Sequence, residues 1–573
     1  MPYTNCKAHM EFIDTTAVAD SAVSSQDNAV MGCLELLKQE DTYPSYAIPD
    51  LNSFLLDGSR EILNQDSSLP FISCEVSDSR CVFPDAPKLE VIFKTPHTSA
   101  GITMRFEDDY PAEIRITWYD LSGPKLIAKT FYPDRLIFFC RNQVDNYGKV
   151  TVEFIRSRLP MQRVKLSYIK YGVELEWNEN SLQSASITEE VDVTSATIPI
   201  NKAEIAIFDE SDDFEISNHN GIWKSIQKRQ CISIMEETED KEVPCGRFYI
   251  ETWKSEKNVI SFSLIDLIGL LDKTKFYGGE IYNSRPAGTI ISAIMKSAGV
   301  EDYSVSDDVE GVLLSGHIPI CTHREALQQV AFACGAIVDC GRQGGINIYI
   351  PDRKIKSIIG TSRKFMGTSI ELDAYVSGVS ITYTVYSPAQ EDSEIYNDIL
   401  PGGISLIEFS DPYIPSSIRA TAGTIVEVGT NFVKVSMTAA GSCTISGRKY
   451  DSRKLTHTEK VDVIEAGETE NVLSFEGCTL FNNEQVKKTA EKLLDYYQMR
   501  KIVKICYLIA EEKTGDWENI MDAQGGMATT QIAQQTIDLT GGFIATATCR
   551  GYSKVNVQYD YTGEFCAGER GII

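Results

Sequence analysis

The stretch EIRITWYD, Glu113–Asp120, decides the fold class of the first part of the chain. The apolar side chains of Ile114, Ile116 and Trp118 alternate with more polar neighbours, and a period of two residues is that of a strand with one buried face. The same alternation recurs in KVTVEFIR (149–156). We therefore expect half-buried strands here, with Trp118 as a core side chain.

Short turn signals separate these strands, at SGP (122–124), YPD (132–134) and NYG (146–148). Many short strands with regular turns and no convincing helix are typical of a β-sandwich, which we predict for residues 51–175. In residues 1–50, Ala, Ser, Asp and Asn dominate from Thr15 to Asn28, and the only amphipathic piece is the short CLELLKQE (33–40). This segment is predicted to form an N-terminal arm or linker.

Downstream of the predicted sandwich the pattern becomes mixed. In THREALQQVAFACG, Thr322 and Glu325 have the spacing of a capping box, and Gly335 suits the end of a helix. A helix is also predicted between Pro286 and Gly299. The last third returns to strands, interrupted by one long amphipathic helix at 484–500.

Composition and charge exclude several classes of protein. The chain has 573 residues, of which 43% are hydrophobic, and this predicts about three or four domains rather than a disordered chain. It shows no apolar run of membrane-spanning length and no signal-peptide pattern, so we expect a soluble chain. The net charge is −27, which argues against nucleic-acid readout.

The 15 cysteines form no CxxC pair and stand singly, mostly in apolar runs. An odd number of cysteines placed in this way predicts reduced thiols, not a disulfide framework.

The best candidate for a metal site is His317, Cys321 and His323 in GHIPICTHREAL. Zinc needs three or four converging ligands, and this segment offers no obvious fourth. His323 falls at the first helical position, where we expect its side chain to face solvent. We therefore predict no metal site.

Signals for catalysis are equally weak, because the sequence contains neither a GxSxG nor an HExxH motif and has only six histidines. The acids Glu107, Asp108 and Asp109 could form a calcium site or a glycosidase pair. A solvated turn is the favoured interpretation. No GlyGly pair precedes a lysine as in a phosphate-binding loop. We predict no catalytic residue, no cofactor and no enzymatic activity.

Several segments, taken in order, resemble a family of tail proteins of phages and prophages from Gram-positive gut bacteria. The resemblance runs from about residue 51 to 551, and its most specific part is THREALQQVAFA. The segments are LLDGS (55–59), TSAGITMRFEDDYPAEIRITWYD (98–120), RVKLSYIKYG (163–172), CGRFYIETW (245–253), SLIDLIGLLD (263–272), HIPICTHREALQQVAFACGA (317–336) and TGGFIATATCRGY (540–552).

The resemblance implies a baseplate or tail-tip hub of which three copies form a ring that caps the tail tube. The implied fold is mainly β with α+β parts: a jelly-roll-like sandwich, then hub β-barrel domains with a few helices. The implied boundaries are a first barrel at 176–280, an α+β domain at 281–364, and a second barrel with the long helix at 365–573.

The implied partners are further copies of the chain, distal tail and tail-tube proteins, the tape-measure protein, and tip or fibre proteins. Genomic DNA would pass through the channel without sequence-specific binding, and an acidic lumen would repel its phosphates. The implied location is the virion tail, after synthesis in the host cytoplasm.

Family likeness also implies that the sandwich is similar to carbohydrate-binding modules. Tyr132 and Tyr147 stand at its turns, and an aromatic face can stack on a sugar while the hydroxyl stays hydrated. They are our candidates for contact with a host-surface glycan or a partner. Two alternatives stay open: an adhesion protein that binds carbohydrate or cell wall, and a wall-degrading enzyme.

Overall fold

The computed structural model describes residues 71–107, 109–209, 242–365, 367–521 and 527–552 throughout, together with parts of 5–63 and 214–238. The chain divides into two compact units. We call residues 8–177 and 210–232 the sandwich unit, and residues 1–7, 178–209 and 233–573 the main unit. Of the sequence predictions, Asp108 and the LLDGS segment lie outside the described residues.

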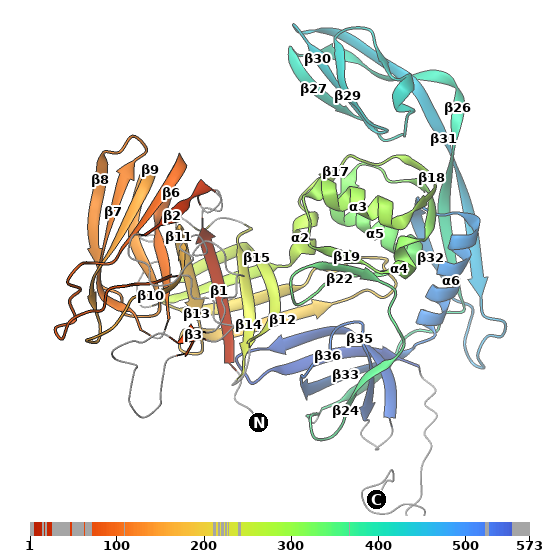
Figure 1. Cartoon of the computed structure of the whole chain (residues 1–573). Coiled ribbons are helices and arrows are strands. Elements are labelled where there is room, and N and C mark those ends of the chain that lie inside the picture. Colours follow the sequence, from red (N-terminus) through yellow and green to blue (C-terminus); the bar gives the residue numbers. More distant parts are fainter. Residues whose placement is uncertain are drawn as a thin grey trace, which may run out of the picture. The chain divides into compact units, whose positions relative to one another are not determined.

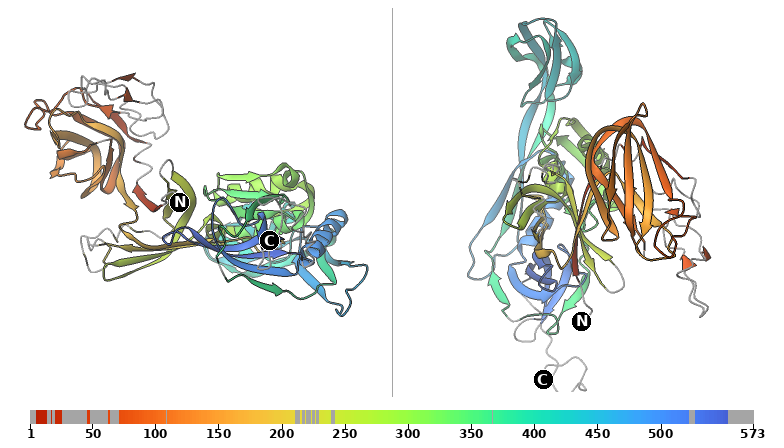
Figure 2. Two further views of the ribbon diagram at one scale, coloured as in Figure 1. Left: turned by 90° about the horizontal axis from the view of Figure 1, so that it is seen from below. Right: turned by 90° about the vertical axis from the view of Figure 1, so that its left-hand side faces the viewer.

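The sandwich unit is built on a seven-stranded sheet (Figure 1) with the order β5-β10-β6-β9-β7-β8, and β2 pairs with β6. The two longest strands, β6 and β9, pair with several register shifts, and such bulges bend a sheet around its own core. Figure 2 shows this curvature from two further sides. The bounds are β2 (Ala22–Ser24), β5 (Phe71–Ile72), β6 (Lys88–Phe106), β7 (Pro111–Asp120), β8 (Lys125–Phe131), β9 (Ile137–Ser157) and β10 (Lys165–Lys170).

Trp118 is fully buried in this sheet, as the alternation in EIRITWYD predicted. Around it the core is aromatic and aliphatic. The ring of Phe93 meets those of Tyr147 and Tyr171 edge to face, at centroid distances of 5.3 and 5.0 Å. Such pairs contribute beyond the area that they bury. The sandwich unit is therefore stabilised chiefly by apolar packing.

Strand β1 (Asn5–Ile13) pairs antiparallel with β11 (Gly172–Trp177), in a register that sets Glu11 opposite Glu174. Part of the segment predicted as an arm is thus a strand. The pattern CKAHMEF does alternate, but it is short and stands next to a polar, non-periodic segment. The strands β3 (Tyr46–Ala47) and β4 (Ile62–Leu63) form a separate pair.

The main unit contains a long antiparallel run of strands in the order β15-β16-β13-β12-β35-β36-β33-β25. Strand β34 extends it beside β35, and β24 pairs in parallel with β34. The bounds are β12 (Leu182–Glu190), β13 (Lys202–Phe208), β14 (Cys231–Glu237), β15 (Glu242–Glu256), β16 (Val259–Ile265), β24 (Ile355–Ile359), β25 (Ser369–Leu372), β33 (Lys501–Leu508), β34 (Trp517–Met521), β35 (Met527–Asp538) and β36 (Ile544–Gly551).

Helices cover one apolar core of the main unit, built around α3, α5 and α6. Thr322 and Glu325 form the predicted capping box, and Gly299 and Gly335 end their helices in the left-handed conformation. The helices are α2 (Leu267–Leu271), α3 (Ala287–Ala298), α4 (Asp307–Glu310), α5 (His323–Cys334) and α6 (Asn483–Tyr497); the short strands among them are β17 (Lys275–Phe276), β18 (Ile281–Pro286), β19 (Tyr303–Val305), β20 (Leu313–His317), β21 (Cys321–Thr322), β22 (Ile337–Cys340) and β23 (Ile346–Tyr349).

A long ribbon of β26 and β31 carries a small module at its far end (Figure 1). We call residues 392–448 the tip module. Its buried residues form a cluster of their own, separate from the core around the helices. The bounds are β26 (Gly378–Leu400), β27 (Gly403–Glu408), η3 (Pro415–Ser417), β28 (Arg419–Ala420), β29 (Thr424–Val428), β30 (Phe432–Met437), β31 (Gly441–Lys460) and β32 (Val472–Cys478).

The predicted fold class, mainly β with α+β parts, is confirmed. Every cysteine that the structure describes is a free thiol, as predicted. Among the described residues, no helix has the length and apolar composition needed to cross a bilayer.

Candidate functional site

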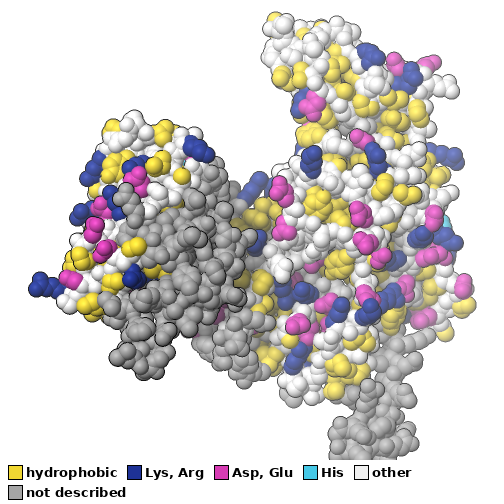
Figure 3. All heavy atoms as spheres, viewed as in Figure 1, with side chains coloured by type: hydrophobic (Ala, Val, Ile, Leu, Met, Phe, Trp, Pro, Cys, Tyr) yellow, Lys and Arg dark blue, Asp and Glu magenta, His cyan; other side chains and the backbone are white. Residues whose placement is uncertain are grey.

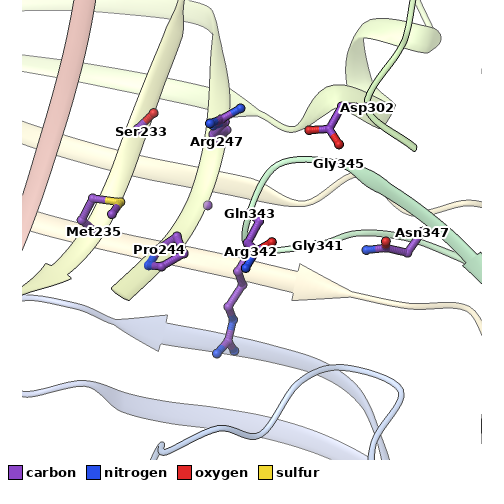
Figure 4. Close-up of a pocket in the computed structure, with 11 residues that line it drawn as sticks. Ser233, Met235, Pro244, Arg247, Asp302, Gly341, Arg342, Gln343, Gly345 and Asn347 are labelled. Atoms are coloured by element: carbon purple, nitrogen blue, oxygen red, sulfur yellow. The ribbon is translucent and has the colours of Figure 1, made fainter. Parts of the chain in front are cut away.

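An open depression in the main unit lies between β14 and β15 on one side and the β22–β23 hairpin on the other (Figure 4). Gly344 has a positive φ of 98°, and a Cβ there would lie 2.6 Å from Cδ of Arg247. The hairpin thus approaches β15 closely only because glycine stands there. The lining residues are Ser233, Met235, Pro244, Gly246, Arg247, Asp302, Gly341, Arg342, Gln343, Gly345 and Asn347.

The side chain of Arg342 runs out of this depression toward the neighbouring strands (Figure 4). Its Nε donates to Oε1 of Glu189 at 2.7 Å, and its Nη2 donates to Oε2 at 3.0 Å and to the carbonyl of Glu512 at 2.9 Å. Nε2 of Gln535 donates to Glu189 at 2.6 Å, and the hydroxyl of Tyr507 donates to Gln535 at 2.9 Å. This buried polar network joins β12, β33, β35 and the β22–β23 hairpin, so its role is structural.

A second buried carboxylate lies nearby, in β34. Glu518 is fully buried, and burial raises its pKa above the usual range. Ser357 donates to Oε1 of the neighbouring Glu512 at 2.7 Å, and Arg363 is ion-paired with the same oxygen. Glu512 is thus already fully engaged. The pair does not present two free carboxylates at a cleft, as glycoside hydrolysis would require.

The structure does not bring His317, Cys321 and His323 together as metal ligands. Both ring nitrogens of His323 have hydroxyl partners, with Nδ1 2.8 Å from Oγ1 of Thr274 and Nε2 3.1 Å from Oγ of Ser297. The expectation that His323 faces solvent was wrong, because only 2% of it is exposed. At the start of α5 its ring packs on Phe276, which the helical position alone could not reveal.

Within the described residues, the donor atoms of His9, Glu11 and Glu174 converge to within 4.8 Å. Nζ of Lys170 lies 3.2 Å from Oε2 of Glu174 and is also paired with Glu11, so an ammonium group already stands between the carboxylates. Burial alone would raise the pKa of Glu174, but hydrogen bonds from His9 and Tyr168 outweigh it and lower the pKa to about 2. The cluster therefore acts as an ionic tie between β1 and β11.

The two candidate tyrosines of the sandwich have different environments. Tyr132 follows β8 and is 68% exposed. Tyr147 is fully buried against Phe93, so its ring is not accessible to a sugar. Of the candidate acids, Asp109 is paired with Arg158, and Glu107 accepts from Ser167. These contacts match the interpretation of a turn.

The feature that sequence reasoning missed is a pair of open edges on the main-unit sheet. Among the described strands, β25 pairs only with β33, and its Ile370 and Leu372 are 44% and 66% exposed. Strand β24 likewise has β34 as its one partner in the described part of the chain, and its Ile355 and Ile358 are 48% and 61% exposed. The signal was present, since IKSII and SIEL are short apolar runs flanked by charges, but neither alternates strictly.

Comparison with known proteins gives a likeness of structure alone. No protein-family model matches the sequence. No curated protein matches it either.

Three of the solved structures that resemble the chain are phage or prophage tail proteins. The tail protein from Neisseria meningitidis MC58 has 10% identity and a TM-score of 0.41, covering 66% of this chain and 93% of that one. The 43 kDa tail protein of prophage MuSo2 from Shewanella oneidensis has 12% identity and a TM-score of 0.40, covering 65% and 95%. Prophage tail protein gp18 from Listeria monocytogenes EGD-e has 10% identity and a TM-score of 0.37, covering 66% and 92%. Likeness at this level does not establish a function for this chain.

Proposed function

We propose that the chain is a structural protein of a phage tail or phage-like particle, a hub at the baseplate or tail tip whose copies join into a ring. The observation that carries this proposal is the pair of open, apolar edges, β24 and β25, on one sheet. Natural proteins usually protect such edges, because unpaired backbone groups recruit further strands. The sequence resemblance to tail proteins points the same way.

The two edges suit a head-to-tail assembly. They differ in sequence: β25 ends the main strand order, and β24 ends a branch that leaves β35 through β34, so one copy can offer β24 to the β25 of the next. Lys356 stands between the exposed isoleucines of β24, and Glu371 stands between Ile370 and Leu372 on β25. Glu371 already pairs with the exposed Lys504 of its own chain at 3.1 Å, so the opposite charges give only a weak preference for this pairing over the pairing of two identical edges. A heterologous contact gives a ring when its rotation closes.

Three copies form the ring in this proposal, and it caps the tail tube. Further partners are distal tail and tail-tube proteins, the tape-measure protein, and tip or fibre proteins. The net charge of −27 on each chain suits a channel along which DNA slides without adhering. On the face seen in Figure 3, Lys and Arg are interspersed with Asp and Glu rather than gathered into a basic surface.

The test is the native mass and electron-microscope image of the purified chain, alone and with its tube and tip partners. We expect a threefold ring. The variants Ile358→Asp and Leu372→Asp should each abolish it by placing a charge at an apolar edge. The control is Val463→Asp, which alters a side chain that is 80% exposed and lies outside both edges. A wild-type chain that stays monomeric under every condition contradicts the proposal.

A second candidate function is recognition of cell-wall carbohydrate by the sandwich unit, favoured by the exposed ring of Tyr132. Binding of host-wall polysaccharide to the full chain, lost in Tyr132→Ala and kept in Tyr119→Ala, would support it. The absence of binding at millimolar glycan would rule out this second function. An enzymatic role has no comparable support in the described residues.

A further inference from the structure

The tip module has a hydrophobic core of its own and is connected to the rest of the main unit by a two-stranded ribbon. Its own core includes Tyr413, Val433 and Val435, all at least nine-tenths buried. It is joined to the remainder of the main unit through the β26–β31 ribbon. Two antiparallel strands are only marginally stable without further packing. Stiffness at the ribbon therefore depends on what packs against it.

The ribbon has a weak point where the module begins. The strand register shifts between Pro388 and Asp392, so three residues of β26 stand without a cross-strand partner. Ser387 and Pro388 on β26 and Asp451 and Ser452 on β31 are exposed. We call residues 387–392 and 449–452 the neck. On the β31 side, Tyr413 bridges to Lys449 and the Tyr450 amide donates to the carbonyl of Pro412 at 2.8 Å, so only the bulged β26 side and residues 451–452 of the neck are free of a third segment. These few residues can absorb a change in backbone angles, as a hinge requires.

Past the neck, the module is held against β17 and the residues after it by a small group of side chains, which we call the clasp. Glu408 on β27 accepts from the hydroxyl of Tyr277 at 2.7 Å and lies 3.3 Å from Nζ of Lys275. The Tyr277 ring meets Phe432 of the module edge to face at 5.5 Å. The Tyr277 hydrogen bond holds the pKa of Glu408 below its usual range.

The ion pair of the clasp is weak because it is exposed. The side chains of Lys275 and Glu408 are 56% and 38% exposed, and exposed ion pairs of this kind contribute little and are screened by salt. Asn431 of the module also faces the buried His317 of β20. Beyond the exposed ion pair the contact is small but buried, since Phe432 is 6% and Asn431 4% exposed. Opening the hinge therefore exposes these two side chains and does not require the module to unfold.

We propose that the tip module is a hinged arm: the clasp of Glu408 with Tyr277 and Lys275 holds it closed, and loss or screening of the clasp lets it swing about the neck. Opening would free the Tyr277 and Phe432 rings and leave both cores intact. This inference does not depend on whether copies of the chain form a ring.

The test is a distance distribution between a label on the arm and one on the body, measured by pulsed dipolar spectroscopy on the full chain. Labels at Val426 and Lys296, attached through unnatural amino acids, avoid the native cysteines. The wild type at low salt should give one narrow distribution. The double variant Glu408→Gln/Tyr277→Phe, or 1 M salt, should raise the open population by roughly two- to five-fold.

The matched control is Glu427→Gln, which breaks an equally exposed ion pair, Lys434–Glu427 at 2.7 Å, inside the module. It should leave the distribution unchanged. A distribution that stays narrow in the double variant and at high salt would show that something other than the clasp holds the arm. A wild-type distance distribution as broad as that of the double variant would show that the clasp does not stabilise the closed state.

Discussion

The two units of the chain stabilise their sheets in different ways. The sandwich unit fills its interior with apolar and aromatic side chains around Trp118. The main unit packs an apolar core around its helices, and its long sheet adds a buried ion pair, Arg342 with Glu189, extended by Gln535 and Tyr507. An apolar core tolerates many packings, whereas a bidentate ion pair is satisfied in one register only. The ion pair therefore fixes the strand register of the main-unit sheet at the place where strands distant in the sequence meet.

The largest effect that would test this contrast is the loss of Arg342. Replacing it by Met leaves the Glu189 carboxylate buried without its cation, which should cost about 3–5 kcal/mol. Hydrogen exchange in peptides from β35 measures the loss. The control is Arg448→Met, because the Arg448–Asp392 pair at 3.3 Å is exposed on both sides and should cost under about 1 kcal/mol. Equal losses in the two variants would show that the buried network has no special role.

The two units should also respond to pH in opposite directions. Burial raises the pKa of Asp266 in the main unit to about 7, so the folded state keeps a proton that the unfolded state releases. Its contribution to stability is complete below about pH 4 and is lost as the pH rises to 7. In the sandwich unit the pKa of Glu174 is lowered to about 2, so its contribution is present above about pH 4 and is lost as the pH falls.

Each of these contributions amounts to roughly 3–4.5 kcal/mol at most. Hydrogen exchange, corrected for the intrinsic rate at each pH, reports them separately in peptides 262–272 and 168–177. Stability that changes with pH in the same direction and over the same range in both peptides would contradict this assignment.

A smaller effect concerns His323, whose two ring nitrogens are both partnered in the interior. His323→Ala removes these contacts and leaves Thr274 and Ser297 without them, so we expect a loss of about 1–3 kcal/mol. Zinc content is measured in the same samples. A variant as stable as the wild type would restore the solvent-facing interpretation, and stoichiometric zinc lost on substitution would restore the metal site.

The smallest effect is that of the helix cap. Thr322→Ala removes the side-chain acceptor of the Glu325 amide and should cost about 1 kcal/mol. Thr322→Ser keeps the hydroxyl and should stay within a few tenths of a kcal/mol of the wild type. Thermal unfolding distinguishes the two, and an equal loss in both variants would mean that the methyl group, not the cap, is responsible.

Local patterns in the sequence predicted local structure well. The alternation around Trp118 identified a strand, and Thr322 with Glu325 identified the start of a helix, because these signals lie within a few residues of each other. The Arg342–Glu189 pair joins residues 153 positions apart and has no local signature. The burial of His323 and Tyr147 was missed for the same reason, since the elements that cover each of them come from elsewhere in the chain.

The open edges could be predicted only in part. IKSII and SIEL show apolar character, but whether a strand lies at an edge depends on which strands pair beside it. The candidate glycan contacts stand at turns, and a turn does not determine whether an aromatic ring points into the core or toward solvent. The Tyr132 side chain is exposed and the Tyr147 side chain is buried, although both residues lie in similar turn motifs.

A photo-cross-link between the two edges tests head-to-tail assembly through β24 and β25 directly. Unlabelled chains that carry a photoreactive amino acid at position 358 are assembled with ¹⁵N-labelled chains. The assembly is illuminated and digested, and the cross-linked peptides are identified by mass. We predict unlabelled-to-labelled links from β24 to the peptide that contains Ile370 and Leu372. Links confined to peptides of the same chain, or links between chains that join β24 to β24, would contradict head-to-tail assembly through these edges.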